Sequence, residues 1–247
     1  MKTFTALGVF GASVVTALTA QNTHGVHGVL PTDPHFVLQQ LDSVLDDLNV
    51  TAIKTGMLAN VGVVQAVARR LEFLPDIPVV VDPVMVATSG DLLLAPEAVA
   101  LYRDNLLPRA ALVTPNLIEA ARLLGIAEAK GIDDAIGQAK ALITSGCRAV
   151  LLKGGHGAGD EIVDILCEPG DVAVFRHRRI ATRNTHGTGC TLSAAITAHL
   201  AMGAPLRLAV EKAIEFLLLA IESGVAHDTG GGHGPVDHLV ALRKHTR

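Results

Sequence analysis

The chain has 247 residues, 49% of them hydrophobic, and this length and composition allow one domain with a large core. Its formal net charge is −4, and we interpret its one basic run, residues 176–179, as a solvated strand end, so we expect no nucleic-acid partner. No apolar run reaches the roughly 18 to 20 uncharged residues of a membrane span, so we expect no membrane partner. The three cysteines show neither CxxC spacing nor an even count, which favours a reducing, cytoplasmic compartment over a disulfide framework.

The apolar N-terminal stretch, residues 6–20, has two possible interpretations. A secretory signal would also be apolar, but Gly8 and Gly11 interrupt the stretch and only one positive charge precedes it. We therefore predict a helix that ends at a glycine, followed by a buried strand over residues 9–19.

Short apolar runs then alternate with amphipathic segments along most of the chain. We predict strands at residues 52–57, 78–83, 111–116 and 149–155, and helices at residues 61–74, 97–107, 117–124 and 133–145. This alternation implies βαβ units and a mostly parallel sheet that is covered on both faces.

The pattern changes after residue 160. Residues 161–166 and 172–175 flank the turn sequence EPGD, which predicts an antiparallel hairpin. Two helices follow, at residues 189–202 and 205–223. Because we find no internal repeat, low-complexity tract or linker, we predict a single domain over residues 1–247.

Residues 184–195, with the sequence NTHGTGCTLSAA, are the most informative segment. Gly187, Thr188 and Gly189 open an Ala-rich helix whose first N–H groups have no partner within the helix, so the segment predicts an anion site. Glycine also lets a phosphate approach the backbone closely, although two glycines could simply form a tight turn. Cys190 lies on the first turn of this helix, where the helix field would favour its thiolate form. Alternatively, Cys190 could simply pack as a small residue, which is what we expect for Cys147 and Cys167.

Other polar residues follow the predicted strands, where ligands bind in parallel sheets. Asn116 and Glu119 could hold Mg²⁺ through oxygen atoms, or they could form an ordinary helix cap. Lys153 could neutralise a nucleotide phosphate, or it could be a solvated residue at a strand end. An anion site, a possible base and oxygen ligands for Mg²⁺ together indicate phosphoryl transfer.

Several nucleotide and metal sites are excluded. The eleven histidines include no helical i,i+4 pair with an acid between them, so we expect no histidine metal site. The GxxxxGK[ST] motif and a GxGxxG after a first strand are both absent, which excludes P-loop and dinucleotide-binding Rossmann proteins.

The motifs together resemble those of the hydroxymethylpyrimidine/phosphomethylpyrimidine kinases of thiamine biosynthesis, in the ribokinase-like superfamily. The resemblance covers the whole chain in order and rests on residues 16–23, 54–57, 82–86, 114–120, 152–156, 184–195 and 233–238. It implies an α/β fold, a three-layer α/β/α sandwich, and phosphorylation by ATP of 4-amino-5-hydroxymethyl-2-methylpyrimidine and then of its monophosphate. It also implies a small-molecule pyrimidine partner, Mg²⁺ and a possible homodimer.

The resemblance also implies roles for individual residues. On the acceptor side, Gln21 would hydrogen-bond the aminopyrimidine edge, and Met57 and Val84 would contact the ring. Cys190 would be the base, where most ribokinase relatives carry Asp, with its pKa lowered toward neutrality by the helix field.

On the nucleotide side, the amides of residues 187–189, including Thr188, would hold the transferred phosphoryl group. Lys153 would face the ATP phosphates, and Asn116 would also lie at the nucleotide. Glu119 would organise Mg²⁺, with Asp82 nearby.

The chain departs from the family at its start. Family members begin with a strand and a Gly/Ser/Asp-rich loop, whereas this sequence starts within the helix that follows, so we expect the N-terminal strand to be missing and Met1 to be an internal residue of a longer protein. Two alternatives remain: a pyridoxal kinase of the same superfamily, and a truncated non-catalytic paralogue that only binds ligand.

Overall fold

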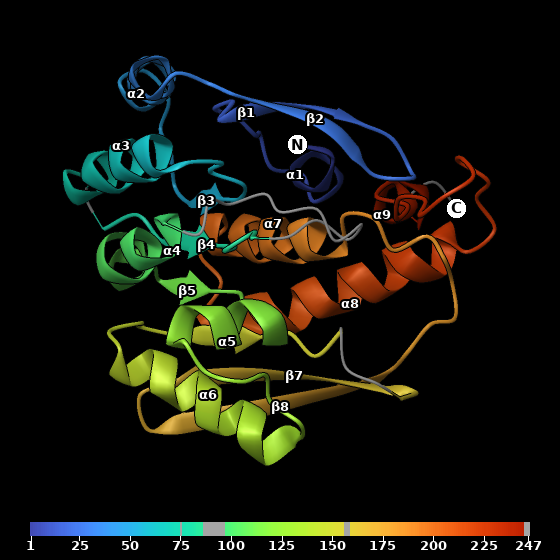
Figure 1. The fold of residues 1–247 in the computed structure, drawn as a ribbon. Helices are drawn as coiled ribbons and strands as arrows, with labels where there is room; N and C mark the ends of the chain where they lie inside the picture. Colours follow the sequence, from blue (N-terminus) through green and yellow to red (C-terminus); the bar gives the residue numbers. More distant parts are fainter. Residues whose placement is uncertain (75, 86–96, 156–158, 245–247) are drawn as a thin grey trace.

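The computed structural model describes residues 1–74, 76–85, 97–155 and 159–244. Its main sheet has six strands in the order β3-β4-β5-β6-β7-β8 (Figure 1). The strands are β3 (Ile53–Thr55), β4 (Val79–Val81), β5 (Leu112–Val113), β6 (Val150–Leu152), β7 (Glu161–Glu168) and β8 (Asp171–Arg178). Strands β3 to β6 are parallel and β7 and β8 are antiparallel, so the predicted parallel sheet and the predicted hairpin are both confirmed.

Helices cover both faces of this sheet. In β4, Val79 and Val81 face one hydrophobic cluster and Val80 faces the other, as the two-residue period of a strand requires. The first cluster contains residues of α3 (Val61–Glu72), α4 (Ala98–Leu101), α5 (Leu117–Leu124) and α6 (Ile132–Thr144). The second contains residues of α1 (Lys2–Ala6), α7 (Thr188–Ala201) and α8 (Leu206–Gly224). The three-layer α/β/α sandwich is therefore confirmed (Figure 1).

Most predicted helices lie within two residues of their observed bounds. Helix α5 matches its prediction because Asn116 and Glu119 form a capping box at its start and Gly125 adopts φ +68° at its end. The helix predicted at residues 97–107 is less regular: α4 passes into a π-helix, η1 (Tyr102–Leu106), and a 3-10 turn, η2 (Leu107–Arg109).

The prediction of a buried strand over residues 9–19 is wrong. Helix α1 does end before a glycine, Gly8 with φ +76°, but residues 9–16 form no strand. Strand β1 (Ala17–Gln21) pairs with β2 (Val26–Pro31) in a separate antiparallel sheet, and most of its residues are exposed. The apolar sequence of this segment therefore does not reflect burial, because the strand pairs in a small separate sheet that leaves most of its residues exposed.

The β1–β2 sheet is held by the C-terminal part of the chain. His233 N donates to Thr23 O at 2.8 Å, and Gly232 N donates to Thr23 Oγ1 at 3.2 Å. A Cβ at Gly232 would lie 2.0 Å from Thr23 O, so only glycine allows this approach. After α8, the chain thus returns to the β1–β2 turn, and the last described element is α9 (Val240–Lys244). Helix α2 (Pro34–Leu45) packs on α3.

A search for membrane-spanning segments gave no candidate among the described residues: none of their helices combines the length and the hydrophobicity that a span needs.

Candidate active site

Charged side chains, including the predicted Asp82 and Lys153, gather at the carboxyl ends of the parallel strands. Lys54 lies in β3, Asp82 directly follows β4, and Lys153 directly follows β6. Lys153 also pairs with Asn116 in a parallel bridge, with Lys153 N donating to Pro115 O at 2.8 Å. One edge of the sheet therefore brings together side chains that are up to about 100 residues apart in the sequence, as expected for a parallel sheet.

The N-terminus of α7 has the features of an anion site. Gly187 precedes the helix with φ +80°, a conformation that favours glycine, and no side chain caps the helix. Thr188 N bonds to Thr185 O at 3.3 Å, and Thr191 N bonds to Gly187 O at 2.8 Å. Within the described part of the chain, the amides of Gly189 and Cys190 have no acceptor. These N–H groups and the helix dipole remain available to an anion.

A buried ion pair lies beside this helix terminus. Lys153 Nζ donates to Asp82 Oδ1 at 3.0 Å, and a Cβ at Gly189 would lie only 3.3 Å from the same ammonium. Asp82 is 1% exposed. Burial acts to raise the pKa of its carboxyl group, but Lys153 and Lys54 outweigh burial and lower it. Burial opposes the charged form of Lys153 as well, yet Asp82 and Glu119 raise its pKa, so Lys153 is not the solvated residue of the simpler interpretation.

Two hydroxyl groups complete the hydrogen bonds of Asp82. Ser193 Oγ donates to Asp82 Oδ2 at 3.0 Å, and Thr114 Oγ1 donates to Asp82 Oδ1 at 3.3 Å. Both residues are fully buried. They lie within segments that the sequence marks as motifs, but their role was not predicted. A serine among the small and apolar residues of a helix that packs on the sheet is the signal that could have identified Ser193.

Asn116 and Glu119 act as a helix cap, the simpler of their two interpretations. Glu119 N donates to Asn116 Oδ1 at 2.8 Å, and Asn116 N donates to Glu119 Oε2 at 2.8 Å. Glu119 is also 4.0 Å from Lys153 Nζ. Burial raises the pKa of Glu119, and the nearby Asp82 adds to this effect while Lys153 opposes it. Two buried carboxyl groups thus lie around one ammonium group, and the one that is farther from it, Glu119, is shifted toward its neutral form.

Cys190 differs from the expectation in its ionisation. Its side chain is exposed, whereas Cys147 and Cys167 are buried, and all three cysteines are free. The expected lowering of the Cys190 pKa is wrong: desolvation by the surrounding protein raises it, Asp82 and Glu119 add to the rise, and Lys54 and Lys153 oppose it. The thiol is therefore accessible, but it is protonated at neutral pH in the ligand-free protein.

The predicted acceptor-side residues are less closely grouped. Met57 is half-buried at the end of β3, and Thr16 Oγ1 donates to its carbonyl at 2.6 Å. Val84 is half-buried just after Asp82. Gln21 ends β1 with an exposed side chain, and its one described side-chain hydrogen bond is with Thr19. Val86 and His156, which belong to two of the motifs, lie outside the described residues.

Asn184, the first residue of the α7 motif, has a structural role that its sequence position did not reveal. It is 2% exposed, and its Nδ2 donates to Gly224 O at 2.7 Å and to His227 O at 2.8 Å. These bonds tie the segment before α7 to the segment after α8.

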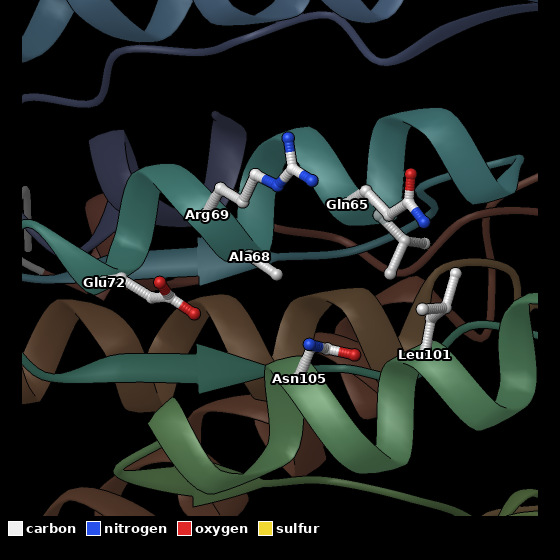
Figure 2. Close-up of a pocket in the computed structure, with 7 residues that line it drawn as sticks. Gln65, Ala68, Arg69, Glu72, Leu101 and Asn105 are labelled. Carbon is white, nitrogen blue, oxygen red and sulfur yellow. The ribbon is translucent and has the colours of Figure 1, made fainter.

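Two surface hollows lie near the main sheet. The first, of about 90 Å³, lies between α3 and the α4–η1 segment and is lined by Gln65, Arg69, Glu72 and Asn105 among others (Figure 2). It contains none of the predicted site residues. The second, of about 390 Å³, is lined by residues 177–181 at the end of β8 and by Leu218 and Glu222 of α8. Because Arg179 Nη1 donates to Gly155 O at 2.9 Å, this second hollow lies close to the segment that carries Lys153.

An anion site at a helix N-terminus, a buried lysine and two carboxylates at the carboxyl edge of an α/β sheet define the class: an enzyme of phosphoryl transfer. Comparison with known proteins agrees. The family model described as phosphomethylpyrimidine kinase matches residues 1–237. The chain therefore belongs to the phosphomethylpyrimidine kinase family.

Individual relatives support the family and the fold. A hydroxymethylpyrimidine/phosphomethylpyrimidine kinase of Rhizobium meliloti is 49% identical over 97% of this chain and 90% of its own length. A phosphomethylpyrimidine kinase structure from Clostridium difficile is 36% identical, has a TM-score of 0.79 and covers 89% of this chain and 90% of its own. An ADP complex of Bacillus subtilis pyridoxal kinase is 36% identical, with a TM-score of 0.88 and coverage of 98% and 91%. The ribokinase-like fold, shared by both kinds of kinase, thus extends over nearly the whole chain.

Proposed function

We propose that this chain transfers a phosphoryl group from ATP to the hydroxymethyl group of 4-amino-5-hydroxymethyl-2-methylpyrimidine, and then from a second ATP to the resulting monophosphate. One observation carries the proposal: the Lys153 ammonium, held by Asp82, lies beside the uncapped N-terminus of α7, where the Cys190 thiol is exposed. An ammonium group and free backbone amides beside an accessible thiol are suited to a phosphoryl group and the hydroxyl that attacks it.

The nucleotide is assigned to the Lys153 side of this edge. Lys153 and the amides of Gly189 and Cys190 would hold the γ-phosphoryl group, and the side-chain NH₂ of Asn116 would reach the nucleotide. The hollow at the end of β8 would take the base or ribose, because its rim residue Arg179 bonds to Gly155 O, two residues after Lys153.

The residues present fit a divalent cation. Asp82 and Glu119 are both buried, and among the described residues Lys153 is the cation that lies within 4.0 Å of both carboxyl groups. Among the described residues, no group of three or more His, Cys, Asp or Glu could hold a metal. Mg²⁺ commonly takes one or two carboxylates and completes its shell with phosphate oxygens and water. Asp82 and Glu119 would hold it there, and it would neutralise charge on the phosphates of ATP.

In the first transfer, the chain must accept a proton from the hydroxymethyl group. The Cys190 thiolate is the proposed base, with the pyrimidine ring against Met57 and Val84 and its amino edge at Gln21. The hydroxyl oxygen bonds to the γ-phosphorus as the bond to the β,γ-bridging oxygen breaks, and ADP leaves with that electron pair.

Pyridoxal is a second candidate acceptor. It also carries a hydroxymethyl group on an aromatic ring, and the chain is similar along 98% of its length to a solved pyridoxal kinase. We rank it second because the more similar curated relatives, at 49% and 46% identity, are pyrimidine kinases.

A product analysis tests both candidates. The purified chain is incubated with ATP, Mg²⁺ and each acceptor separately, and ³¹P NMR follows the monoester, diphosphate and ADP signals. We expect the pyrimidine alcohol to give first the monophosphate and then the diphosphate, with kcat/KM at least about tenfold above that for pyridoxal. A preference for pyridoxal would reverse the ranking, and ligand binding by calorimetry without any turnover would identify a non-catalytic binding protein.

We also infer a cytoplasmic homodimer. The free cysteines support a reducing compartment, and Leu18 and Leu30 of the β1–β2 sheet are 59% and 66% exposed, which supports a further contact on that sheet. Light scattering at two protein concentrations measures the mass, and a monomer at both would contradict the dimer.

A further inference from the structure

Lys54 is a second cation at the edge that carries the proposed active site. It is half-buried in β3, and a Cβ at Gly56 would lie 3.3 Å from its Nζ, so the ammonium group folds toward the end of its own strand. Within the described part of the chain, Lys54 forms no ion pair. It nevertheless lies close enough to help lower the pKa of Asp82 and to oppose the rise in the pKa of Cys190.

The two lysines of the site differ in their surroundings. Lys153 is held by Asp82 at 3.0 Å and lies 4.0 Å from Glu119, so these two carboxyl groups fix the position of its ammonium group. Lys54 has no such carboxylate contact in the described residues, and a half-buried ammonium group without one is suited to an anionic ligand.

The two lysines lie on, or directly after, strands that are not neighbours in the sheet. Lys54 is in β3 and Lys153 follows β6, with β4 and β5 between them. Neighbouring strands are about 4.8 Å apart, so the two strands are roughly 14 Å apart. Helix α7, which carries Cys190, packs against both β3 and β4. Lys54 is therefore on the Met57 side of Cys190, and Lys153 marks the nucleotide side.

We propose that Lys54 binds the phosphate group of the monophosphate acceptor and so serves the second phosphoryl transfer specifically. This inference rests on the proposed function. In that transfer, a phosphate oxygen of the monophosphate donates an electron pair to the γ-phosphorus of ATP. The bond from the γ-phosphorus to the bridging oxygen breaks, and ADP leaves with its electron pair. The acceptor enters as a dianion above pH 6 to 7, so it needs a positive counter-charge and no base.

The test compares both acceptors in matched variants. Lys54→Met keeps the length of the side chain and removes its charge, and Lys54→Arg keeps the charge. Lys140→Met, on the exposed side of α6, is the control. For each variant, kcat/KM is measured with the pyrimidine alcohol and with its monophosphate, and calorimetry gives the Kd of the monophosphate without ATP. Thermal melting verifies that each variant is folded.

We expect Lys54→Met to lower kcat/KM for the monophosphate by about 30- to 100-fold, because a charge-assisted hydrogen bond to the phosphate is lost. The loss for the alcohol should be less than about tenfold, because that reaction loses only the effect of the Lys54 charge on the pKa of Cys190. Binding of the monophosphate should weaken by a similar factor, and Lys54→Arg should recover most of it. Equal losses for the two acceptors, or no loss, would overturn the assignment. If the wild-type chain phosphorylates neither pyrimidine, the proposed function itself is wrong.

Discussion

At the scale of single residues, the candidate site contains charged groups in unequal states. Asp82 and Lys153 stabilise each other's charged forms, whereas Glu119 and Cys190 are both shifted toward their neutral forms. The raised pKa of Cys190 means that this thiol is a weak resting base. Its chemistry therefore depends on the pH and on the charge that a bound nucleotide and cation bring to the site.

Replacing the thiol tests the base directly. Cys190→Ala should lower kcat for the hydroxymethyl acceptor by about 100-fold or more, because general base catalysis typically contributes 10²–10⁴-fold. The same change should affect the monophosphate acceptor much less, since that acceptor has no proton to lose, and the Kd of ATP should change little. Steady-state kinetics with both acceptors provides the measurement. Wild-type turnover of the alcohol by this variant would remove the thiol from the mechanism.

The pH profile gives an independent test. Since the pKa of Cys190 is raised, the thiolate fraction is small at pH 7 and grows with pH. The kcat for the alcohol should therefore still be rising between pH 7 and pH 9. In Cys190→Asp, a carboxylate is ionised throughout this range, so the slope should disappear. If the kcat of the wild type for the alcohol stops rising below about pH 7.5, the base is not a thiol with a raised pKa.

At the scale of elements, close backbone approaches hold the site segments in place. Gly154 N donates to Asp164 Oδ1 at 2.8 Å, and a Cβ at Gly154 would lie 2.1 Å from Val163 O in β7. His177 of β8 lies 3.1 Å from the other oxygen of Asp164. The hairpin therefore fixes the residue that directly follows Lys153.

A pair of neighbouring glycines isolates this packing effect. Gly154→Ala should lower the free energy of unfolding by about 2 to 4 kcal/mol, because the new methyl group overlaps backbone atoms that cannot rotate away. Gly155→Ala is the control, since nothing lies within 4 Å of its added Cβ. Urea denaturation of both variants measures the difference. Equal stabilities would show that β7 can move away from Gly154 at little cost.

At the scale of the whole molecule, one buried cluster connects the sheet to the helical layer that contains α7. Asp82 follows β4, Lys153 follows β6, and Ser193 lies on α7, so the hydrogen bonds of Asp82 join two strands of the sheet to one helical layer. The segments around Asn184 and Thr23 then tie the C-terminal part of the chain to α7 and to the β1–β2 sheet.

Breaking this cluster should change both the stability and its dependence on pH. Among the described residues, Asp82→Asn leaves Lys153 with Glu119 at 4.0 Å as its nearest carboxyl partner, and we expect a loss of about 2 to 4 kcal/mol near neutral pH. The folded pKa of Asp82 is lowered, so its contribution is complete above its unfolded pKa of about 3.9 and is lost as the pH falls through the folded value. The folded pKa of Lys153 is raised, so its contribution is lost only as the pH rises above about 10.4.

Urea denaturation of the wild type and Asp82→Asn from pH 3 to pH 9 tests this expectation. The stability difference should be constant from about pH 5 to pH 9 and should shrink toward pH 3. If the stability difference between the wild type and Asp82→Asn is largest in acid, the folded pKa of Asp82 is not lowered.

The sequence by itself determined the regular elements and their class. Periods of two and 3.6 residues, caps such as Asn116 with Glu119, and glycines at helix ends are local signals, so helices α3, α5, α6, α7 and α8 and strands β3 to β8 could be predicted. The same signals placed Asp82, Asn116 and Lys153 at strand ends, since these residues follow β4, β5 and β6 in the sequence. The family resemblance rested on the same motifs, and the comparisons confirmed it.

Only the tertiary structure decided what those residues contact. Whether Lys153 is solvated or paired depends on Asp82, 71 positions away, and the shift of the Cys190 pKa depends on desolvation by the fold around it. The segment over residues 9–19 is apolar yet forms no buried strand, because burial is decided by the layers that cover a segment and not by its own composition. Local sequence carries periodicity and capping, whereas ionisation, burial and long-range hydrogen bonds exist only once distant segments are packed together.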